Sequence, residues 1–589
     1  MNLSGGSTSG KETSFSGMLE RINVSGESSG TSVVFNFLRN FTIEGIEPFI
    51  RYQCLLNDLK PEITFGQYDM VHQEVLDKNS HLYRSSPDIV VVALYLDTYL
   101  PDGWRASWRA AGVMNTLAGL FADIAQNTDA IIAVNTFVPP FYSDFGISAV
   151  RDVSSHHNEV QHLNQLIREH VLSSPARFVL IDWERFVRVL GENESMDYRF
   201  WYMSKAPFKK GFLELYAREL VTIANALKGK SRKCLILDCD NTLWGGIVGE
   251  DGLRGLKLDR HTYPGNIFYE FQKSILRLHE RGILIAICSK NNEQDVWDVL
   301  KGHPDCLLKR EHLSAWRINW DDKATNISSL AEELNLGTDS FVFVDDNPVE
   351  CGLIRDMLPE VTVLQVPEKL YTYPLLLNRD RLFDVLAVSS EDRQRSQMYR
   401  AEASRKHEQA KFETVGQYLA SLLISIAVHP ATADEVARVA QLTQKTNQFN
   451  LTTRRYSEAR IAALRRNPDW AVMSLLVRDK FGESGLTGVL IARREGVEGI
   501  VDSLLMSCRI LGRTIEQVFV LESFAVLERL WGIKTWRAEF IPTRKNQQVA
   551  GFWRSIGFTE IDTKDGHTRY TLSCAVPMLD PIPYIAIEE

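Results

Sequence analysis

The chain has 589 residues, too many for one hydrophobic core, so the sequence predicts three or four domains. Its formal charge of −9 argues against a nucleic-acid-binding protein, because that function needs a basic face. No apolar run reaches the roughly 20 residues that span a membrane, and the N-terminus lacks the apolar core of a signal peptide. We therefore expect a cytoplasmic protein.

Residues 1–30 are rich in Ser and Gly and predict a disordered tail. In the next segment, 31–228, apolar runs typical of strands alternate with segments of helical spacing. Such alternation favours a doubly wound parallel sheet. The strands are expected at 32–38, 89–96, 130–138 and 178–183, and the main helices at 107–127 and 158–173.

A second α/β domain is expected over 229–388, and a charged connecting helix over 389–419. The third domain, 420–589, mixes the runs ISIAVHP, WAVMSLLVRD, LTGVLIARR and GIVDSLLMS with an amphipathic helix over 514–531. This pattern predicts an α+β domain around a largely antiparallel sheet. In the second domain the strands are expected at 234–237, 283–289, 340–346 and 361–366, and the helices at 265–281 and from Asn292.

The most informative segment is LILDCDNTLW, in which a buried strand places Asp238 at its carboxyl end and Asp240 two residues later. Open parallel sheets carry their sites at such ends. One carboxylate can attack phosphorus, and the other can protonate the leaving oxygen and then activate water. Because two close carboxylates repel each other, they need a cation, and carboxylates with phosphate oxygens suit Mg²⁺.

Further polar residues follow later strands of the second domain. Asp345 and Asp346 end the run SFVFV and are predicted as additional metal ligands beside Asp238 and Asp240. Each of these parts is common by itself, but their order after successive apolar strands predicts phosphoryl transfer. The residues predicted to bind phosphate are Thr242, Ser289, Lys290, Asn291 and Lys323.

The ordered set resembles the haloacid dehalogenase (HAD) superfamily over about 230–370. The resemblance implies that Asp238 is the nucleophile and Asp240 the general acid and base. It also implies that Ser289 and Lys323 hold the phosphoryl group and that Asp345 or Asp346 binds the metal. No large cap insertion fits between these parts, so we expect an open site, which suits a macromolecular partner.

The longer string LDCDNTLWGGIVGEDG is more specific. Together with NFTIEGIEPFI, FWYMSKAPF, FVDDNPVE, NQFNLTTRRYS and SCRILGRTIE, it resembles the FkbH-like family, HAD subfamily IIIC, over almost the whole chain after the tail. Members of that family act in polyketide-type pathways. The resemblance implies that the protein takes a glyceryl group from 1,3-bisphosphoglycerate, removes phosphate, and loads the acyl group as a thioester on an acyl carrier protein.

A thioester route raises the question of which thiol carries the acyl group. Cys239 lies between the two aspartates and is our first candidate for a catalytic thiol, and Cys508 is the second. The alternative for Cys239 is simple packing, since the middle residue of D-x-D can face the apolar side of the strand. The eight cysteines contain no C-x-x-C pair, which is typical of reduced thiols without a zinc site.

The flanking domains resemble two other folds. The first resembles an SGNH hydrolase, but the segment after its first strand, Arg39 to Thr42, has no serine, so we expect a docking module without esterase activity. The third resembles a GCN5-related N-acetyltransferase (GNAT). There Arg509, Gly512 and Arg513 precede a helix and are predicted to hold the phosphopantetheine arm of the carrier, although Thr514 departs from the family pattern.

Three functions remain open at this point. The first is the carrier-loading glyceryltransferase and phosphatase. The second is a phosphatase for a small phosphate ester, or an acyltransferase that uses coenzyme A. The third is a non-catalytic scaffold whose HAD site is idle, which the complete set of acids with Ser289 and Lys323 argues against.

Overall fold

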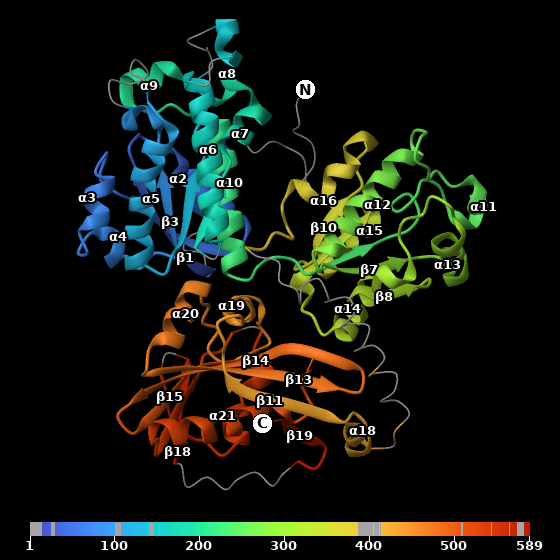
Figure 1. Cartoon of the computed structure of the whole chain (residues 1–589). Coiled ribbons are helices and arrows are strands. Elements are labelled where there is room, and N and C mark those ends of the chain that lie inside the picture. The colour runs from blue at the N-terminus through green and yellow to red at the C-terminus, as the bar shows by residue number, and fades with distance from the viewer. Residues whose placement is uncertain are drawn as a thin grey trace. The chain divides into compact units, whose positions relative to one another are not determined.

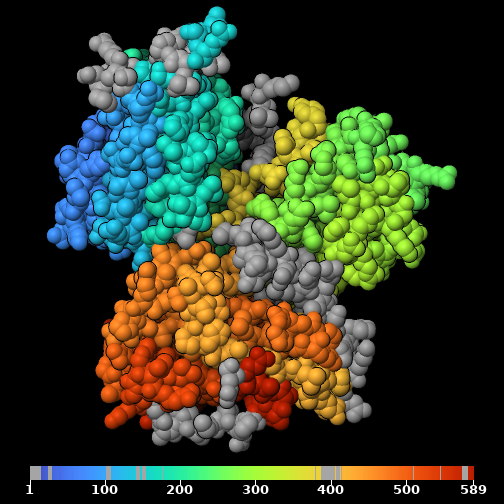
Figure 2. All heavy atoms as spheres, viewed as in Figure 1, coloured from blue at the N-terminus to red at the C-terminus, as the bar shows by residue number. Residues whose placement is uncertain are grey.

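The computed structural model contains three folded regions, shown in Figure 1. Figure 2 shows all heavy atoms as spheres in the same view. The chain divides into two compact units, with the main boundary between Lys228 and Gly229. The central and third regions belong to the same unit. No helix in the described ranges is long and apolar enough to cross a membrane. The structure describes residues 15–24, 30–100, 108–140, 146–151, 154–175, 177–386, 405, 412, 414–507, 510–543, 545–564, 566–573 and 582–588.

The first region is a five-stranded sheet in the order β2-β1-β3-β4-β5, and every neighbouring pair is parallel. This confirms the parallel sheet predicted for this region. Its strands are β1 (Thr31–Arg39), β2 (Leu59–Phe65), β3 (Ile89–Ala93), β4 (Ile131–Asn135) and β5 (Phe178–Ile181). Its helices are α1 (Phe15–Val24), α2 (Glu47–Leu56), α3 (Val71–Leu76), α4 (His81–Arg84), α5 (Ala110–Asn127), α6 (His156–Ser173), α7 (Trp183–Leu190), α8 (Glu192–Ser195), α9 (Tyr198–Ser204) and α10 (Lys210–Leu227).

The prediction of a disordered tail over 1–30 is wrong for Phe15–Val24, which forms helix α1. Met18 is buried, and the ring of Phe15 lies 5.7 Å from that of Phe49 on α2. Apolar residues inside the Ser/Gly-rich segment therefore give the helix a packing partner. The rest of the predicted tail, apart from Gly30, lies outside the described residues.

The central region is also a five-stranded parallel sheet, in the order β10-β9-β6-β7-β8. Alternate strand residues enter two separate cores: Leu235 and Leu237 face one side with α12, and Cys234 and Ile236 face the other with α14. Helices therefore cover both faces. The elements are β6 (Cys234–Leu237), α11 (Val248–Gly255), α12 (Gly265–Glu280), β7 (Leu284–Ser289), α13 (Glu293–Gly302), β8 (Leu313–Ile318), α14 (Lys323–Leu334), β9 (Phe341–Asp345), α15 (Pro348–Met357), β10 (Thr362–Gln365) and α16 (Leu376–Arg379).

The third region contains a larger sheet in the order β17-β18-β16-β15-β14-β13-β11-β19. Most pairs are antiparallel, as predicted, and the pairs β15–β16 and β11–β19 are parallel. The helix predicted at 514–531 is α21 (Ile515–Trp531). The predicted connecting helix at 389–419 falls mostly outside the described residues. The other elements are α18 (Val415–Ser421), β11 (Ile424–Pro430), α19 (Val436–Lys445), β12 (Phe449–Asn450), α20 (Glu458–Arg466), β13 (Trp470–Asp479), β14 (Gly482–Glu495), β15 (Glu498–Met506), β16 (Thr535–Phe540), α22 (Phe552–Ser555), β17 (Thr559–Lys564), β18 (His567–Ser573) and β19 (Ile585–Glu588).

Candidate active site

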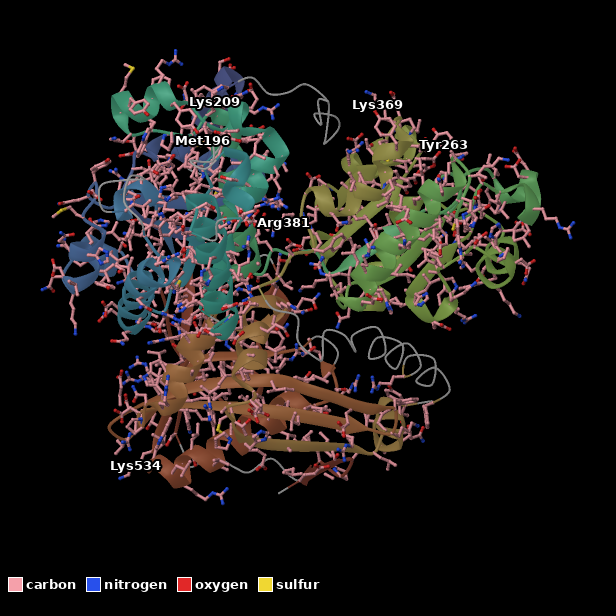
Figure 3. The ribbon with its side chains drawn as sticks, turned by 45° about the horizontal axis from the view of Figure 1, so that its top comes forward. Met196, Lys209, Tyr263, Lys369, Arg381 and Lys534 are labelled. Atoms are coloured by element: carbon pink, nitrogen blue, oxygen red, sulfur yellow. The ribbon has the colours of Figure 1, made fainter. Side chains whose placement is uncertain are left out.

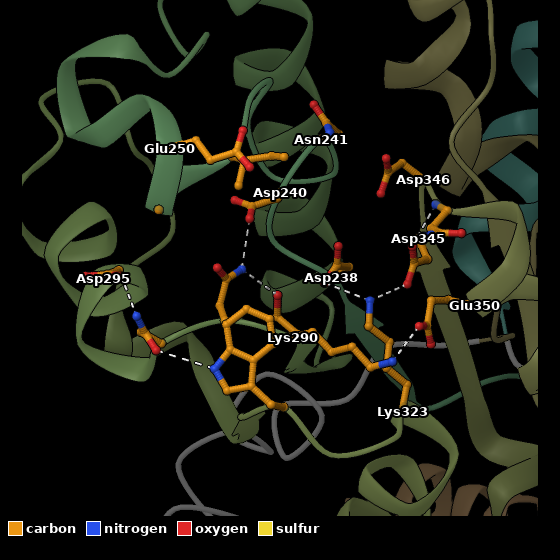
Figure 4. A pocket seen from close by; sticks show the side chains of 17 residues that line it. Asp238, Asp240, Asn241, Glu250, Lys290, Asp295, Lys323, Asp345, Asp346 and Glu350 are labelled. Carbon is orange, nitrogen blue, oxygen red and sulfur yellow. Dashed lines mark hydrogen bonds and ion pairs between the residues drawn. The ribbon is translucent and has the colours of Figure 1, made fainter.

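The carboxyl edge of the central sheet carries a polar cleft of about 400 Å³ (Figure 4). Seven carboxylates and two lysines line it, so the cleft is strongly negative. An anionic substrate would be repelled from it unless a cation entered as well. The lining residues are Asp238, Asp240, Asn241, Ile247, Gly249, Glu250, Ser289, Lys290, Asn291, Asn292, Asp295, Trp320, Lys323, Asp345, Asp346, Asn347 and Glu350.

Lys323 is the centre of the charge network. It is the first residue of α14 and is buried, and its Nζ lies 3.0 Å from Asp238 Oδ1 and 2.6 Å from Asp345 Oδ2. Burial opposes its charged form, but the two carboxylates outweigh burial and raise the pKa of Lys323 above its ordinary value. Lys323 is therefore a fixed cation between two acids, and its predicted contact with a phosphoryl group stays a prediction.

Asp238 follows β6, and its amide N–H donates to Val344 O on the neighbouring strand β9 at 3.0 Å. Burial raises the pKa of its carboxyl group to about 6, and the repulsion of Asp345 adds to this, while Lys323 offsets part of the shift. A cation next to this carboxylate would favour the ionised form, which is the form that can attack phosphorus.

Three of the four predicted metal ligands converge. One oxygen each of Asp238, Asp345 and Asp346 lies within 4.8 Å of the others. Burial and the charge of Asp345 raise the pKa of Asp346, as expected for like charges held together. Hard carboxylate oxygens in an open cleft fit Mg²⁺, which commonly takes one or two carboxylates together with waters and substrate phosphate.

Asp240 lies in the same cleft but outside this group of three. Its Oδ1 accepts hydrogen bonds from Trp244 Nε1 at 2.9 Å and from the Val248 N–H at 3.1 Å. Its Oδ2 accepts from Asn291 Nδ2 at 3.1 Å. These donors fix the carboxylate in a position suited to proton transfer, and the structure supports it less as a metal ligand than the sequence suggested.

Ser289, Lys290 and Asn291 lie side by side at the end of β7. Ser289 Oγ accepts from Asn291 Nδ2 at 3.1 Å, so Asn291 connects Ser289 with Asp240. Lys290 forms an ion pair with Glu350 at 2.7 Å. The Asn291 amide therefore holds the Ser289 hydroxyl at the cleft. Lys290 also lines the cleft, and its ammonium group is paired with the Glu350 carboxylate.

The structure contradicts the phosphate-binding role predicted for Thr242. Its side chain is fully buried and does not line the cleft, and within the described chain its Oγ1 has no hydrogen-bond partner. The cause is the backbone of Asn241, whose φ of 51° turns the chain after Asp240. Thr242 acts instead through its carbonyl oxygen, which accepts from Tyr373 Oη at 2.9 Å.

The structure also opposes the role predicted for Cys239. Its side chain is fully buried in the core on the α12 face of the sheet and does not line the cleft. Burial and the nearby Asp238 carboxylate raise the pKa of the thiol well above its ordinary value. Because the thiolate is the nucleophile, this environment suits packing. The rival, Cys508, lies outside the described residues.

The predicted phosphopantetheine site in the third region is only partly described. Arg509 lies outside the described residues. The Gly512 N–H donates to Glu516 Oε1 at 2.5 Å, and Arg513 is buried with its Nη1 3.2 Å from Asp479 Oδ2. Both groups are therefore engaged by carboxylates in this structure, and their contact with a phosphopantetheine arm stays a prediction.

Several lining residues were not predicted from the sequence. Glu350 and Asn347 follow the acidic pair in FVDDNPVE, and Glu250 belongs to the string GIVGEDG, so both motifs contained the signal. No motif in the sequence pointed to Asn292 or Trp320 as lining residues. Trp320 is 70% exposed at the cleft, and its Nε1 donates to Asn292 Oδ1 at 3.4 Å.

The parallel sheet with its helices on both faces, the buried lysine between two aspartates and the three converging carboxylates are the arrangement expected of a HAD-like domain. The chain is similar to the N-terminal part of the protein BF1531 from Bacteroides fragilis, which contains a phosphatase domain and was crystallised with Mg. The two share 26% identity with a TM-score of 0.57, over 63% of this chain and 99% of that one. The aligned 63% of this chain is longer than the central region alone.

Two acetyltransferase structures also align with about a quarter of the chain. One is the ribosomal-protein-S18-alanine N-acetyltransferase from Escherichia coli, with 14% identity, a TM-score of 0.21, and coverage of 26% of this chain and 97% of that one. The other is the PaiA N-acetyltransferase from Thermoplasma acidophilum, with 18% identity, a TM-score of 0.19, and coverage of 25% and 98%.

No protein-family model matches the chain, and no curated protein matches it.

Proposed function

We propose that this protein is a Mg²⁺-dependent glyceryltransferase and phosphatase that converts 1,3-bisphosphoglycerate into a glyceryl thioester on an acyl carrier protein. The observation that carries the phosphatase part is the buried Lys323 between Asp238 and Asp345, beside the group of three carboxylates. The acyl acceptor and the pathway are supported by the resemblance to the FkbH-like family.

The conversion breaks two different bonds. At the three-position, a phosphate ester is cleaved at its P–O bond, which is the reaction of a HAD-type site. At the one-position, an acyl phosphate is cleaved at its C–O bond: a thiol sulfur attacks the carbonyl carbon, the phosphate leaves with the bridging oxygen, and the thiol loses its proton. Attack on phosphorus at the one-position would only give a free carboxylate and lose the activated acyl group.

The residues of the cleft suit the ester cleavage. Asp238 attacks phosphorus, and Ser289 and Lys323 contact the phosphoryl oxygens. Asp240 protonates the leaving alkoxide and then takes a proton from the water that hydrolyses the aspartyl-phosphate. Mg²⁺, when bound by Asp238, Asp345 and Asp346, supplies positive charge for the phosphoryl oxygens.

The acyl transfer needs a thiol that attacks the carbonyl carbon, and this thiol need not be a cysteine of this chain. Among the described residues, all six free cysteines are buried and none lines the cleft. We therefore assign the attack on the carbonyl carbon to the phosphopantetheine thiol of the carrier itself. The SGNH-like and GNAT-like regions expected from the sequence would then serve to bind the carrier.

The test compares the wild-type protein with the Asp238→Asn variant. Each is incubated with 1,3-bisphosphoglycerate, Mg²⁺ and holo-acyl carrier protein, and the carrier is weighed by intact-mass spectrometry while released phosphate is measured. We expect the wild type to give glyceryl-carrier with two phosphates per acyl group. The variant should give phosphoglyceryl-carrier with one, because only the ester cleavage needs the Asp238 carboxylate.

The other candidate functions predict different outcomes. Phosphate release from 1,3-bisphosphoglycerate without any carrier adduct would indicate a phosphatase for small phosphate esters. No phosphate release from the wild type in the presence of Mg²⁺ would indicate a scaffold. A carrier that the Asp238→Asn variant leaves unloaded would show that the acyl transfer also depends on this cleft.

A further inference from the structure

Both lysines of the catalytic cleft are already paired with carboxylates. Lys323 contacts Asp238 at 3.0 Å and Asp345 at 2.6 Å. Lys290 contacts Glu350 at 2.7 Å. Figure 4 shows both ammonium groups on the side of the cleft that holds these partners. A negatively charged group elsewhere in the cleft therefore meets no unpaired lysine among the described lining residues.

The leaving group of a phosphate ester must occupy the other side of the cleft, next to Asp240. In phosphoryl transfer the attacking and leaving oxygens are roughly in line, so the leaving oxygen points away from the attacking Asp238. Asp240, which protonates that oxygen in the proposed mechanism, accepts from the Val248 N–H at 3.1 Å and from Asn291 Nδ2 at 3.1 Å. These contacts identify the part of the cleft that receives the leaving group.

Two further carboxylates belong to this part of the cleft. Glu250 follows Val248 by two residues in the first turn of α11, and Asp295, in the first turn of α13, also lines the cleft. Asp295 Oδ2 accepts from Asn292 Nδ2 at 3.2 Å, and no lysine or arginine in the described ranges pairs with either acid. Figure 4 shows both acids on the opposite side of Asp238 from Asp346.

The helices alone explain why acidic residues stand at these two positions, because the dipole at a helix N-terminus is positive and favours them. Their place in the cleft adds a second effect, a negative field where the leaving group must lie. Elsewhere on the central region, around the labelled Tyr263 and Lys369, Figure 3 shows nitrogen-tipped and oxygen-tipped side chains mixed. The single sign of charge is thus a feature of the cleft.

The other residues of this part of the cleft are neutral. Trp320 is 70% exposed, and its Nε1 donates to Asn292 Oδ1 at 3.4 Å, so the indole is held at the cleft. An aromatic ring and an amide can contact an uncharged group, but neither balances a negative charge. We call Asp240, Glu250, Asn292, Asp295 and Trp320 the leaving-group side of the cleft.

We propose that the cleft selects phosphate monoesters whose leaving group carries no negative charge, with Glu250 and Asp295 as the specificity-determining residues. This inference rests on the ester cleavage of the proposed function, and it names the class of ester that the site accepts. The carboxylate of 3-phosphoglycerate and the second phosphate of 1,3-bisphosphoglycerate would enter the leaving-group side and be repelled there. A phosphoglyceryl thioester carries neither charge, so it belongs to the accepted class.

The experiment compares two substrates that differ in the charge of the leaving group. They are 3-phosphoglycerate and its carboxamide, in which an uncharged amide of nearly the same size replaces the carboxylate. Phosphate release by the full-length protein with Mg²⁺ gives kcat/KM for each substrate, at low and at high salt. The variants are Glu250→Gln and Asp295→Asn. The matched control is Asp298→Asn, which removes an exposed charge about one turn further along α13 and outside the cleft lining.

We expect the wild type to prefer the carboxamide by at least about tenfold in kcat/KM at low salt, because like charges face the carboxylate. High salt should reduce this preference, since salt screens the repulsion. Glu250→Gln and Asp295→Asn should each reduce it by raising kcat/KM for 3-phosphoglycerate. Asp298→Asn should keep the wild-type preference.

Equal kcat/KM values for the two substrates in the wild type would overturn the inference and leave the proposed function standing. A preference that both cleft variants keep in full would also overturn it, because the selection would not come from these carboxylates. Carrier loading tests the proposed function separately. A wild type that prefers the carboxamide but never loads a carrier would overturn the glyceryl transfer and leave the charge selection in place.

Discussion

The first and central regions contain parallel sheets of the same size, yet their carboxyl edges differ in chemistry. In the central sheet, Asp238 follows its first strand and joins a group of charged side chains open to a cleft. In the first sheet, Asn40 follows the first strand, and its amide is hydrogen bonded to the backbone of Tyr95 on both sides. The same place in the same type of fold is an active-site candidate in one region and a packed core in the other.

The packing of the first sheet's edge is aromatic. The ring of Trp183 lies 5.9 Å from Phe41 and 4.9 Å from Phe208, and Trp201 packs on Tyr95. Asn135, at the end of β4, exchanges two hydrogen bonds with the backbone of Leu94. Parallel topology therefore provides only the location of a site, and charged side chains that the protein does not fully neutralise provide the chemistry.

The first prediction exchanges a carboxylate for an amide in the central sheet. Asp238→Asn should lower phosphate release from a simple phosphate ester by at least about 10³-fold, because an amide is a poor nucleophile. The melting temperature should not fall, since the change removes a carboxylate whose charged form is disfavoured by burial. Steady-state kinetics and thermal unfolding test both parts. A variant that keeps a tenth of the activity would remove Asp238 from the role of nucleophile.

The second prediction makes the reverse exchange in the first sheet. Asn40→Asp places a carboxylate oxygen against the carbonyl of Tyr95, where the amide now donates at 2.9 Å in a site that is 1% exposed. We expect a loss of about 3 kcal/mol in the free energy of unfolding, because the hydrogen bond from the amide to the Tyr95 carbonyl is lost and the new buried charge faces that carbonyl oxygen. Denaturant unfolding measures this loss. Phosphate release by the folded fraction should stay normal, and reduced turnover of that fraction would show that the two edges are coupled.

The third prediction concerns metal binding, which should distinguish the two edges directly. At about 100 times its Kd, Mg²⁺ should stabilise the protein by about 2.7 kcal/mol through preferential binding to the folded state. Asp346→Asn should weaken this effect, because it removes one of the three converging oxygens. Calorimetry in the presence of EDTA or Mg²⁺ measures it. An equal Mg²⁺ effect in the wild type and the variant would place the ion elsewhere.

The fourth and smallest effect is expected at Cys239. If the buried thiol only packs, Cys239→Ala should cost about 1 kcal/mol of stability, as for a typical small cavity. Carrier loading should continue at the wild-type rate, because the thiol does not line the cleft. Loss of loading together with loss of a hydroxylamine-sensitive acyl adduct would restore Cys239 as the acyl carrier.

The sequence predicted the buried strands well and the edge strands less well. In the first and central sheets it missed β2 and β8, each at an edge, although it predicted the other edge strands, β5 and β10. β2 contains Lys60 and Pro61, and β8 contains Arg317, so neither has the continuous apolar run of a strand covered on both faces. The apolar pattern of a single sequence reveals strands that are buried on both faces. An edge strand such as β2 forms because it hydrogen bonds to one neighbouring strand, and the apolar pattern does not show this pairing.

The same limit applies within the candidate site. The acids were predictable because each follows a strand, and Lys323 was predictable from its place between Ser289 and Asp345 in the ordered set. The roles of Thr242 and Cys239 were not, since they depend on how the backbone turns after Asp238, including the positive φ of Asn241. Spacing in the D-x-D-x-T pattern suggests alternate side chains on one face, but that inference holds only while the strand continues, and β6 ends at Leu237.

The position of Lys323 has a consequence for how the protein matures. With its ammonium group between Asp238 and Asp345, the chain carries an internal counter-ion and can complete its fold before any metal arrives. Together with Asp346, these side chains leave two net negative charges, which one divalent ion would balance. We therefore expect the chain to fold before it binds a metal, so that the level of free Mg²⁺ would set the activity without changing the amount of folded protein.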